Sequence, residues 1–444
     1  MNRIIILCIT SLLAAFPAQA QTKLWSLGDC IEYALEKNID VQQRKVEVEN
    51  KELSLSTSRF SRLPALSGNV GENYNIGRTQ NREGVYEDHG AATTSVGANA
   101  SITVFQGFRI NNQIKADKLS LEAATQDLEQ ARQDISLQIT AFYLQVLYSM
   151  ESEKLSEKQV KINSELVERA KKLVAGGRSS LSELYDAQSA LARSESSLVD
   201  AANSTQTAIL DLAQEMNCPD YSSIAIELPD VDSMVDHEAL LLSPVDSIYS
   251  DYIQRRPAVM AAQKRVEQAE ANIKVAKSSF WPSINVGASY SSGYYSDQTA
   301  FGGGGSFWNQ LGRNGSTAIG ASLSIPIFNR MSTVNSVKTA KNNARTSRLS
   351  LEQAKLNAFK EVQQAYVNAK AAYSKYLAEI KSVDAAKKAF EFEQKKFDNG
   401  TSTSYQFNEV RQKLETATSQ MFQAKYSFLL RAKILDFYKG EPLY

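Results

Sequence analysis

The chain has 444 residues, of which 43% are hydrophobic and 22% are charged, and its 49 basic residues balance its 49 acidic ones. A formal net charge of zero gives no bulk attraction to nucleic acid, so a nucleic-acid partner is not expected. With only two histidines and no Walker, zinc-spacing or G-x-S-x-G motif, the sequence predicts no metal site, no cofactor and no enzyme active site.

The first twenty residues have the pattern of a secretory signal. Arg3 precedes an apolar run over residues 4–16, and Ala18-Gln19-Ala20 is the small-x-small pattern that signal peptidase cleaves. The run is shorter than the ~20 residues that a membrane-spanning helix needs. We therefore predict a signal peptide over residues 1–20 and an exported bacterial protein.

Two cysteines, Cys30 and Cys218, remain after the signal is removed. An oxidising compartment would let them form a disulfide. Each lies at the outer end of a predicted helix, so the sequence is equally compatible with a Cys30–Cys218 bond and with two free thiols.

Two segments predict very long helices. Residues 65–218 and 327–441 contain no proline, and within them residues 108–175 and 331–399 also lack glycine. Both segments are rich in Ala, Leu, Gln, Glu and Lys, which favour helix. At ~1.5 Å per residue, a helix of ~65 residues is about 100 Å long, which is too long for an ordinary globular core.

The apolar residues of these helices recur at coiled-coil spacing. One set repeats every seven residues and another alternates steps of three and four, which is the spacing of a helix-packing seam. We expect these side chains to hold helices together and to contact no ligand. They are Ile114, Leu121, Leu128, Ile135, Phe142, Leu351, Ala358, Ala365, Ala372, Phe407, Val410, Leu414, Ala417, Met421, Ala424 and Phe428.

Each long helix ends in a glycine turn that predicts a helical hairpin. The turns are Ala175-Gly176-Gly177-Arg178 and Asp398-Asn399-Gly400-Thr401. Glycine suits the left-handed conformation that ends a helix, and the serines and threonines that follow can cap a returning helix. We expect return helices at about 181–216 and 405–437.

Four short segments have a period of two instead. Apolar residues alternate with Gly, Ser, Asn or Thr over residues 94–105, 283–291 and 317–328, and more weakly over 66–76. One apolar face and one small polar face are typical of transmembrane β-strands with lipid outside and water inside. Residues 77–92 and 296–316, between paired strands, are expected to form exposed loops.

Four strands cannot close a barrel, and an open sheet edge in lipid leaves backbone groups without hydrogen bonds. Two copies would give eight strands and a filled lumen, whereas three would give twelve strands around water. Because the inward residues are small and polar, we predict a homotrimer. The expected membrane part is a 12-stranded transmembrane β-barrel, with four strands per chain.

A tandem duplication underlies this organisation. Residues 96–205 align with residues 319–428 without a gap, so that Tyr143 faces Tyr366 and Gly177 faces Gly400. We predict a first repeat over 21–216, a linker over 217–250, a second repeat over 251–437 and a tail over 438–444. Each repeat has an initial helix, a strand pair (about 65–105 and 283–328), a long helix (about 108–175 and 331–398), a tip turn and a return helix.

The chain resembles the TolC-type outer membrane efflux proteins over essentially its whole mature length. The clearest motif is the first tip, where a G-x-x-S-x-x-(D/E)-x-x-D-A-Q pattern is formed by Gly177, Ser180, Glu183, Asp186, Ala187 and Gln188. Further similar segments are Ser26–Leu35, Arg256–Val259 and Ser278–Pro282. The second tip, with Gly400, Thr403, Gln406 and Glu409, is a looser copy.

This resemblance implies a trimeric exit duct in the outer membrane of a Gram-negative bacterium, with most of the chain in the periplasm. In such a duct the 12-stranded transmembrane β-barrel is continuous with a long periplasmic α-helical coiled-coil barrel, and the linker over 217–250 is an equatorial linker around its outside. Its partners would be outer-membrane lipid, a periplasmic adaptor and an inner-membrane pump of the RND or ABC type. The duct would be passive and gated, and would carry small molecules or proteins. The alternative is a periplasmic coiled-coil structural or adaptor protein without a membrane channel, which needs hairpins but no lipid-facing strands.

Two sets of candidate site residues follow from these patterns. The adaptor-docking tip comprises Gly176, Gly177, Ser180, Leu181, Gly400, Ser402 and Thr403. Three acidic residues near the tip could form rings that constrict the pore and bind cations, since threefold symmetry triples each charge: Asp186, Asp398 and Glu409. The tip turns are equally compatible with simple hairpin closure, whereas for any single one of the three acidic residues a solvated helix end is the favoured interpretation.

Overall fold

The computed structural model describes residues 24–80, 84–221, 224–229, 245–296 and 305–443. The predicted signal peptide and much of the predicted linker therefore lie outside the described residues. The chain divides into two compact units, one containing residues 1–43, 131–253 and 358–444 and the other residues 44–130 and 254–357. Each unit combines segments from both repeats, so the two halves of the duplication do not fold as separate bodies.

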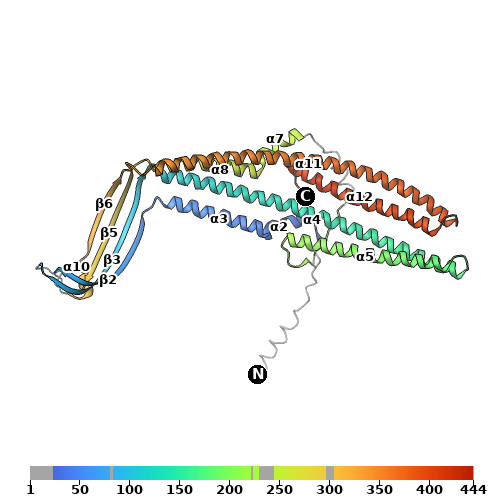
Figure 1. The fold of residues 1–444 in the computed structure, drawn as a ribbon, viewed down its shortest axis with the longest axis horizontal. Helices are drawn as coiled ribbons and strands as arrows, with labels where there is room; N and C mark the ends of the chain where they lie inside the picture. Colours follow the sequence, from blue (N-terminus) through green and yellow to red (C-terminus); the bar gives the residue numbers. More distant parts are fainter. Residues whose placement is uncertain (1–23, 81–83, 222–223, 230–244, 297–304, 444) are drawn as a thin grey trace, which may run out of the picture. The chain divides into compact units, whose positions relative to one another are not determined.

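Fifteen elements follow one another along the described residues (Figure 1). In the first repeat they are β1 (Leu24–Trp25), α2 (Leu27–Lys37), α3 (Ile39–Phe60), β2 (Ala65–Gln80), β3 (Tyr86–Gln106), α4 (Arg109–Ala175) and α5 (Leu181–Glu215). They continue as β4 (Ala225–Ile226), α7 (Val245–Arg255), α8 (Pro257–Ser278), β5 (Ser283–Tyr295), α10 (Phe307–Arg313), β6 (Ser316–Ser324), α11 (Ser332–Asp398) and α12 (Ser404–Lys439).

The duplication is visible in the lengths of the helices. Helices α2 and α7 both have 11 residues, α3 and α8 both have 22, and α4 and α11 both have 67. Helix α7 begins 218 residues after α2, whereas α11 begins 223 residues after α4. The five extra residues of the second repeat lie in its strand segment, which also contains α10. The two predicted long helices are confirmed.

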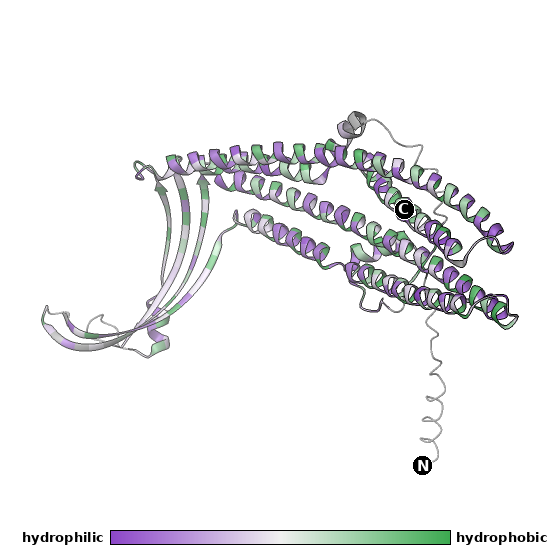
Figure 2. Cartoon of the chain, turned by 45° about the vertical axis from the view of Figure 1, so that its right-hand side comes forward, coloured by the Kyte–Doolittle hydropathy of each residue, from purple (hydrophilic) through white to green (hydrophobic). Residues whose placement is uncertain are grey.

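The predicted seam residues pack as expected. None of them is exposed, and on α12 the side chains of Phe407, Ala417, Ala424 and Phe428 are buried. Phe428 lies against the rings of α11, with its centroid 5.0 Å from that of Tyr373. Figure 2 shows hydrophilic and hydrophobic residues recurring along the long helices. Among the described residues, no helix is long and apolar enough to cross a membrane.

A small parallel sheet that the sequence did not predict joins the start of the first repeat to the linker. Strand β1 pairs with β4, with Leu24 opposite Ala225 and Trp25 opposite Ile226. The buried Tyr143 of α4 donates a hydrogen bond of 2.9 Å to the carbonyl of Glu227, immediately after β4. Burial raises the pKa of Tyr143, so the hydroxyl stays protonated and remains a donor.

The four longer strands form one antiparallel sheet in the order β2-β3-β5-β6 (Figure 1). Its register places apolar residues opposite one another across all three strand pairs: Val70 with Val96, Ala98 with Tyr290, and Val286 with Ala321. The alternation of each strand therefore converges on one shared apolar face. A bulge between Thr103 and Phe105 shifts the register by one residue and brings Phe105 opposite Ile284, on the same face.

Three predicted boundaries in this region are wrong. Residues 77–80 and 86–92, predicted as a loop, continue β2 and β3. Backbone hydrogen bonds between the two strands extend as far as Gln80 and Tyr86, although the sequence there lacks the apolar–polar alternation used for the prediction. The second predicted loop, 296–316, contains the helix α10. Strand β6 ends at Ser324 instead of about residue 328, because Pro326 has no N–H to donate to a ladder.

Cys30 and Cys218 do not form a disulfide with each other. Cys30 is buried in α2 and Cys218 is partly exposed. The sequence had left the disulfide open, and the structure does not contain it.

Candidate functional site

The two helical hairpins close through the same backbone motif. After α4, Gly177 has φ 67°, its N–H donates to the carbonyl of Val174, and the N–H of Arg178 donates to that of Leu173. After α11, Gly400 has φ 74°, its N–H donates to Phe397, and the N–H of Thr401 donates to Lys396. Both are Schellman turns, in which a glycine takes the left-handed conformation and the last helical carbonyls are satisfied. The looser second copy of the motif thus forms the same turn.

The two return helices are capped alike. Ser180 precedes α5 with φ −84° and ψ 154°, and Thr403 precedes α12 with φ −85° and ψ 153°. The Ser180 hydroxyl accepts a hydrogen bond of 3.3 Å from the N–H of Glu183, and the Thr403 hydroxyl accepts one of 3.3 Å from Gln406. A hydroxyl three residues before these donors satisfies one of the open N–H groups of the first helical turn.

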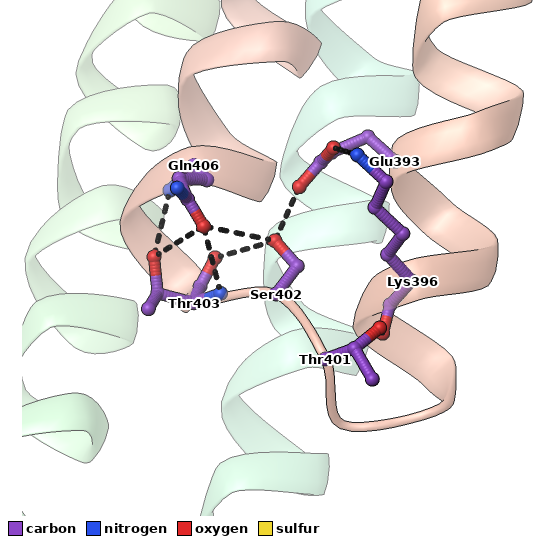
Figure 3. Close-up of polar contacts among 6 residues, drawn as sticks. All are labelled: Glu393, Lys396, Thr401, Ser402, Thr403 and Gln406. Atoms are coloured by element: carbon purple, nitrogen blue, oxygen red, sulfur yellow. Dashed lines mark hydrogen bonds and ion pairs between the residues drawn. The ribbon is translucent and has the colours of Figure 1, made fainter.

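The second tip carries a wider polar network than the first (Figure 3). Ser402 donates a hydrogen bond to the carboxylate of Glu393, which also lies 3.4 Å from the Lys396 ammonium. Thr401 donates to the carbonyl of Lys396 at 3.1 Å. The hydrogen bond from Ser402, followed by the hydrogen bond and the charge of Lys396, lowers the pKa of Glu393. At the first tip, the corresponding contact is local, from Ser179 to Glu183.

A charged and aromatic contact joins the two hairpins. Arg169 of α4 forms a 2.7 Å ion pair with Asp398 of α11, and its guanidinium lies 5.0 Å from the ring centroid of Phe397. Phe397 stacks in turn on the buried Phe407 of α12, with centroids 4.6 Å apart. Beside this contact the turns and helices enclose a cavity of about 450 Å³, lined by Leu166, Leu173, Ala187, Ala190, Phe407 and Asn408 among others.

The structure places the predicted tip residues at the surface. Gly176, Gly177, Ser180, Leu181, Gly400 and Thr403 are exposed, and Ser402 is half-buried by its contact with Glu393. Two large aromatic side chains near them are also exposed, Tyr185 on α5 and Tyr405 on α12. The predicted second tip turn, residues 400–405, already included Tyr405. Sequence reasoning missed Tyr185, although exposed aromatic residues beside a turn are a usual mark of a contact surface.

The three acidic candidates near the tip differ in their surroundings. Asp398 is paired with Arg169, and Glu409 is paired with Lys413 one turn further along α12 at 2.7 Å. Asp186 is exposed on α5 and has no ion pair among the described residues. Within the same residues, no group of three or more His, Cys, Asp or Glu side chains could hold a metal ion.

The class of protein follows from comparison with known families. The family model of outer membrane efflux proteins matches residues 30–217 and 248–441, which is most of the chain. The chain is 23% identical over 379 residues to the outer membrane protein TolC of Vibrio cholerae, covering 85% of this chain and 82% of that one.

Two solved outer membrane channels have the same fold. CmeC of Campylobacter jejuni superimposes with a TM-score of 0.75 at 19% identity, covering 93% of this chain and 85% of that one. MtrE of Neisseria gonorrhoeae, in its open state, superimposes with a TM-score of 0.72 at 21% identity, covering 94% and 89%.

The chain belongs to the outer membrane efflux protein family, and it is an efflux channel protein of the outer membrane of a Gram-negative bacterium. The predicted resemblance to TolC-type proteins is confirmed. The alternative of a coiled-coil protein without membrane strands is not supported, since the chain contains a four-stranded sheet with one apolar face.

Proposed function

We propose that three copies of this chain form one 12-stranded barrel in the outer membrane, continuous with a periplasmic tunnel of coiled-coil helices. The observation that carries this proposal is the open sheet. Strands β2 and β6 are its two edges, so each leaves a row of backbone groups unpaired in a single chain. In lipid such edges are costly, and closure by identical copies removes them.

The two faces of the sheet support the same assembly. Leu66, Val70, Ile76 and Ile319 each have about four-fifths of their surface exposed on the apolar face, which suits contact with lipid. The other face carries polar side chains that bond across strands: Asn99 donates to Asn69 at 3.1 Å and Thr103 to Asn285 at 2.8 Å. A polar inner face favours twelve strands around water over eight around a packed core.

The tunnel would be a passive, gated exit duct for small molecules or proteins. Transport energy would come from an inner-membrane pump of the RND or ABC type, because the chain has no nucleotide-binding motif of its own. The residue layout supports this assignment: two repeats flank a linker at about 217–250, and each repeat supplies one hairpin to the tunnel. No catalytic chemistry is proposed for the chain.

The hairpin tips would dock the periplasmic adaptor. Six of the seven predicted docking residues are exposed, and Tyr185 and Tyr405 add apolar contact area beside them. Of the acidic candidates for a pore constriction, Asp186 is the best placed, since Asp398 and Glu409 have cationic partners within the chain. Threefold repetition of an unpaired carboxylate would attract cations.

The mass of the detergent-solubilised particle tests the assembly. Light scattering with the detergent contribution subtracted should give three chains per particle, and a monomer would contradict the proposal. The faces are tested by single cysteines at Ile102 and Ser101, neighbours on opposite faces of β3. A lipid-soluble maleimide should label Ile102→Cys and not Ser101→Cys, and the reverse pattern would mean that the sheet is inverted.

A further inference from the structure

Helix α10 takes the place of a missing piece of strand. Strand β6 begins at Ser316, which pairs with Ser291, so within the described residues the end of β5 after Ser291 has no partner strand on that side. Their unpaired side is identified by Ser296, whose N–H points toward β3 and donates to Ala92 at 2.9 Å. Successive residues of a strand point to opposite sides, so Gly293 and Tyr295 point away from β3, toward the line of β6.

The side chains of α10 satisfy that exposed edge. Gln310 accepts a hydrogen bond from the N–H of Tyr295 at 3.0 Å and donates to its carbonyl at 3.2 Å. Asn314, just after the helix, donates to the carbonyl of Gly293 at 2.7 Å. Two amide side chains four residues apart on a helical turn thus match two backbone positions two residues apart on a strand. Ser292 also donates to the carbonyl of Leu311 at 2.6 Å.

The two edges of the sheet differ in length. Strand β2 has 16 residues, whereas β6 has nine. In the proposed trimer, β6 of one copy pairs with β2 of the next, so it can cover at most nine residues of that strand. The remaining part of β2 would project beyond β6 with its edge uncovered.

The tilt of barrel strands indicates which part of β2 stays uncovered. A tilt of 35–45° displaces neighbouring strands by roughly one residue each, or about four to six residues over four strands. Within one chain Ser316 lies in the same hydrogen-bonded row as Asn69, through Ser291 and Gly97. The displacement therefore places Ser316 opposite about residue 73 to 75 of the next copy. A displacement in the opposite direction would place Ser316 opposite about residue 63 to 65, so that the rest of β6 would lie beyond the first residue of β2 and could not pair with it.

Helix α10 stands where β6 would otherwise continue, beside the uncovered end of that neighbouring β2. The side chain of Gln310 is buried toward β5, and Trp308, two residues earlier and so about 200° around the helix, is 79% exposed. In a single chain Ile76 is 82% exposed and Tyr74 64% exposed, both on the apolar face of β2.

We propose that Trp308 packs against Tyr74 and Ile76 of the next copy, so that α10 seals the outer rim between subunits where β6 is too short. This inference rests on the proposed trimer, and its partner is a second copy of the chain. Gln310 and Asn314 form hydrogen bonds with the edge of β5 in their own chain, while the indole of Trp308 covers the apolar end of β2 in the next copy.

Cysteine crosslinking tests the contact. In a background with Cys30→Ser and Cys218→Ser, the pair Trp308→Cys and Ile76→Cys should give covalently linked subunits with a short bismaleimide. The matched control pair, Trp308→Cys with Leu66→Cys, uses the same face of β2 ten residues away, or about 33 Å, and should not crosslink. Light scattering on the same samples shows whether the trimer itself has formed.

The outcomes separate the inference from the trimer on which it rests. Absence of the Trp308–Ile76 crosslink in particles of three chains would overturn the contact and leave the trimer intact. The competing occupant of the Trp308 face is lipid. Trp281, two residues before β5 and 60% exposed, serves as the reference tryptophan. Comparison of Trp308→Phe and Trp281→Phe with the parent protein gives the fluorescence of each indole, and brominated phospholipid should quench Trp308 less than Trp281. Stronger quenching of Trp308 than of Trp281 would also overturn the inference.

Discussion

The two hairpin tips have the same backbone but different side-chain support. Each has one left-handed glycine, two Schellman hydrogen bonds and a hydroxyl cap. The first tip adds a contact between Ser179 and Glu183, whereas the second ties its turn back to α11 through Glu393 and packs the buried Phe407 under it. The glycine and the capping hydroxyl are therefore enough to keep the same turn in both repeats. The side-chain contacts that stabilise each tip differ between the repeats.

The aromatic packing should give the largest difference between the tips. Phe407 is 4% exposed and contacts Phe390 and Phe397. Phe407→Ala should destabilise its hairpin by about 3–5 kcal/mol through lost burial and a cavity. The equivalent residue of the first repeat, Leu184, is half-buried, so Leu184→Ala should cost roughly 1–2 kcal/mol. Equal losses in calorimetric unfolding would show that the tips are supported alike.

The turn glycines should show no difference. Gly177 and Gly400 both have positive φ and open space around the position of a Cβ atom, so alanine meets only backbone strain. Gly177→Ala and Gly400→Ala should each cost about 1–2 kcal/mol. Gly176→Ala, at the neighbouring position without positive φ, is the matched control and should change the unfolding temperature much less. A large gap between the two turns would contradict their common backbone.

The caps should differ modestly. Thr403 and Gln406 form a reciprocal capping box, whereas Ser180 accepts a single hydrogen bond from Glu183. Ser180→Ala and Thr403→Ala should each cost about 1 kcal/mol, with the larger loss at Thr403. Thr403→Ser keeps the hydroxyl and should restore most of the stability, which separates capping from packing of the methyl group.

The smallest effect should appear as a pH dependence confined to the second tip. The folded pKa of Glu393 is lowered, so its contribution to stability is present above the unfolded pKa and is lost as pH falls through the folded value. Ser402→Ala removes the hydrogen bond that is the main cause of the lowered pKa. The unfolding temperature of this variant should therefore fall less steeply as the pH is lowered. The same substitution in a Glu393→Gln background should have no such effect, and a persistent difference there would point to another group.

Local patterns in the sequence determined the helices, the turns and the shared face of the strands. Breaker-free segments predicted α4 and α11 to within one residue, and the glycines at 177 and 400 predicted both turns, because backbone conformation there depends on neighbours in the chain. Alternation in each strand predicted an apolar face, and the register confirms that the four faces coincide.

Tertiary structure decided what depends on residues far apart in sequence. Residues Gly77 to Gln80 are part of β2 because they pair with β3. Helix α10 caps β5 because β6 is too short to cover that edge. The Arg169–Asp398 ion pair forms because the two hairpins lie next to each other. Likewise, the Tyr143 hydroxyl can donate to the carbonyl of Glu227 only because β4 lies beside α4. Hydropathy and secondary-structure propensity describe one segment of the sequence at a time. Each of these contacts depends instead on which distant segment lies beside that one in the folded chain.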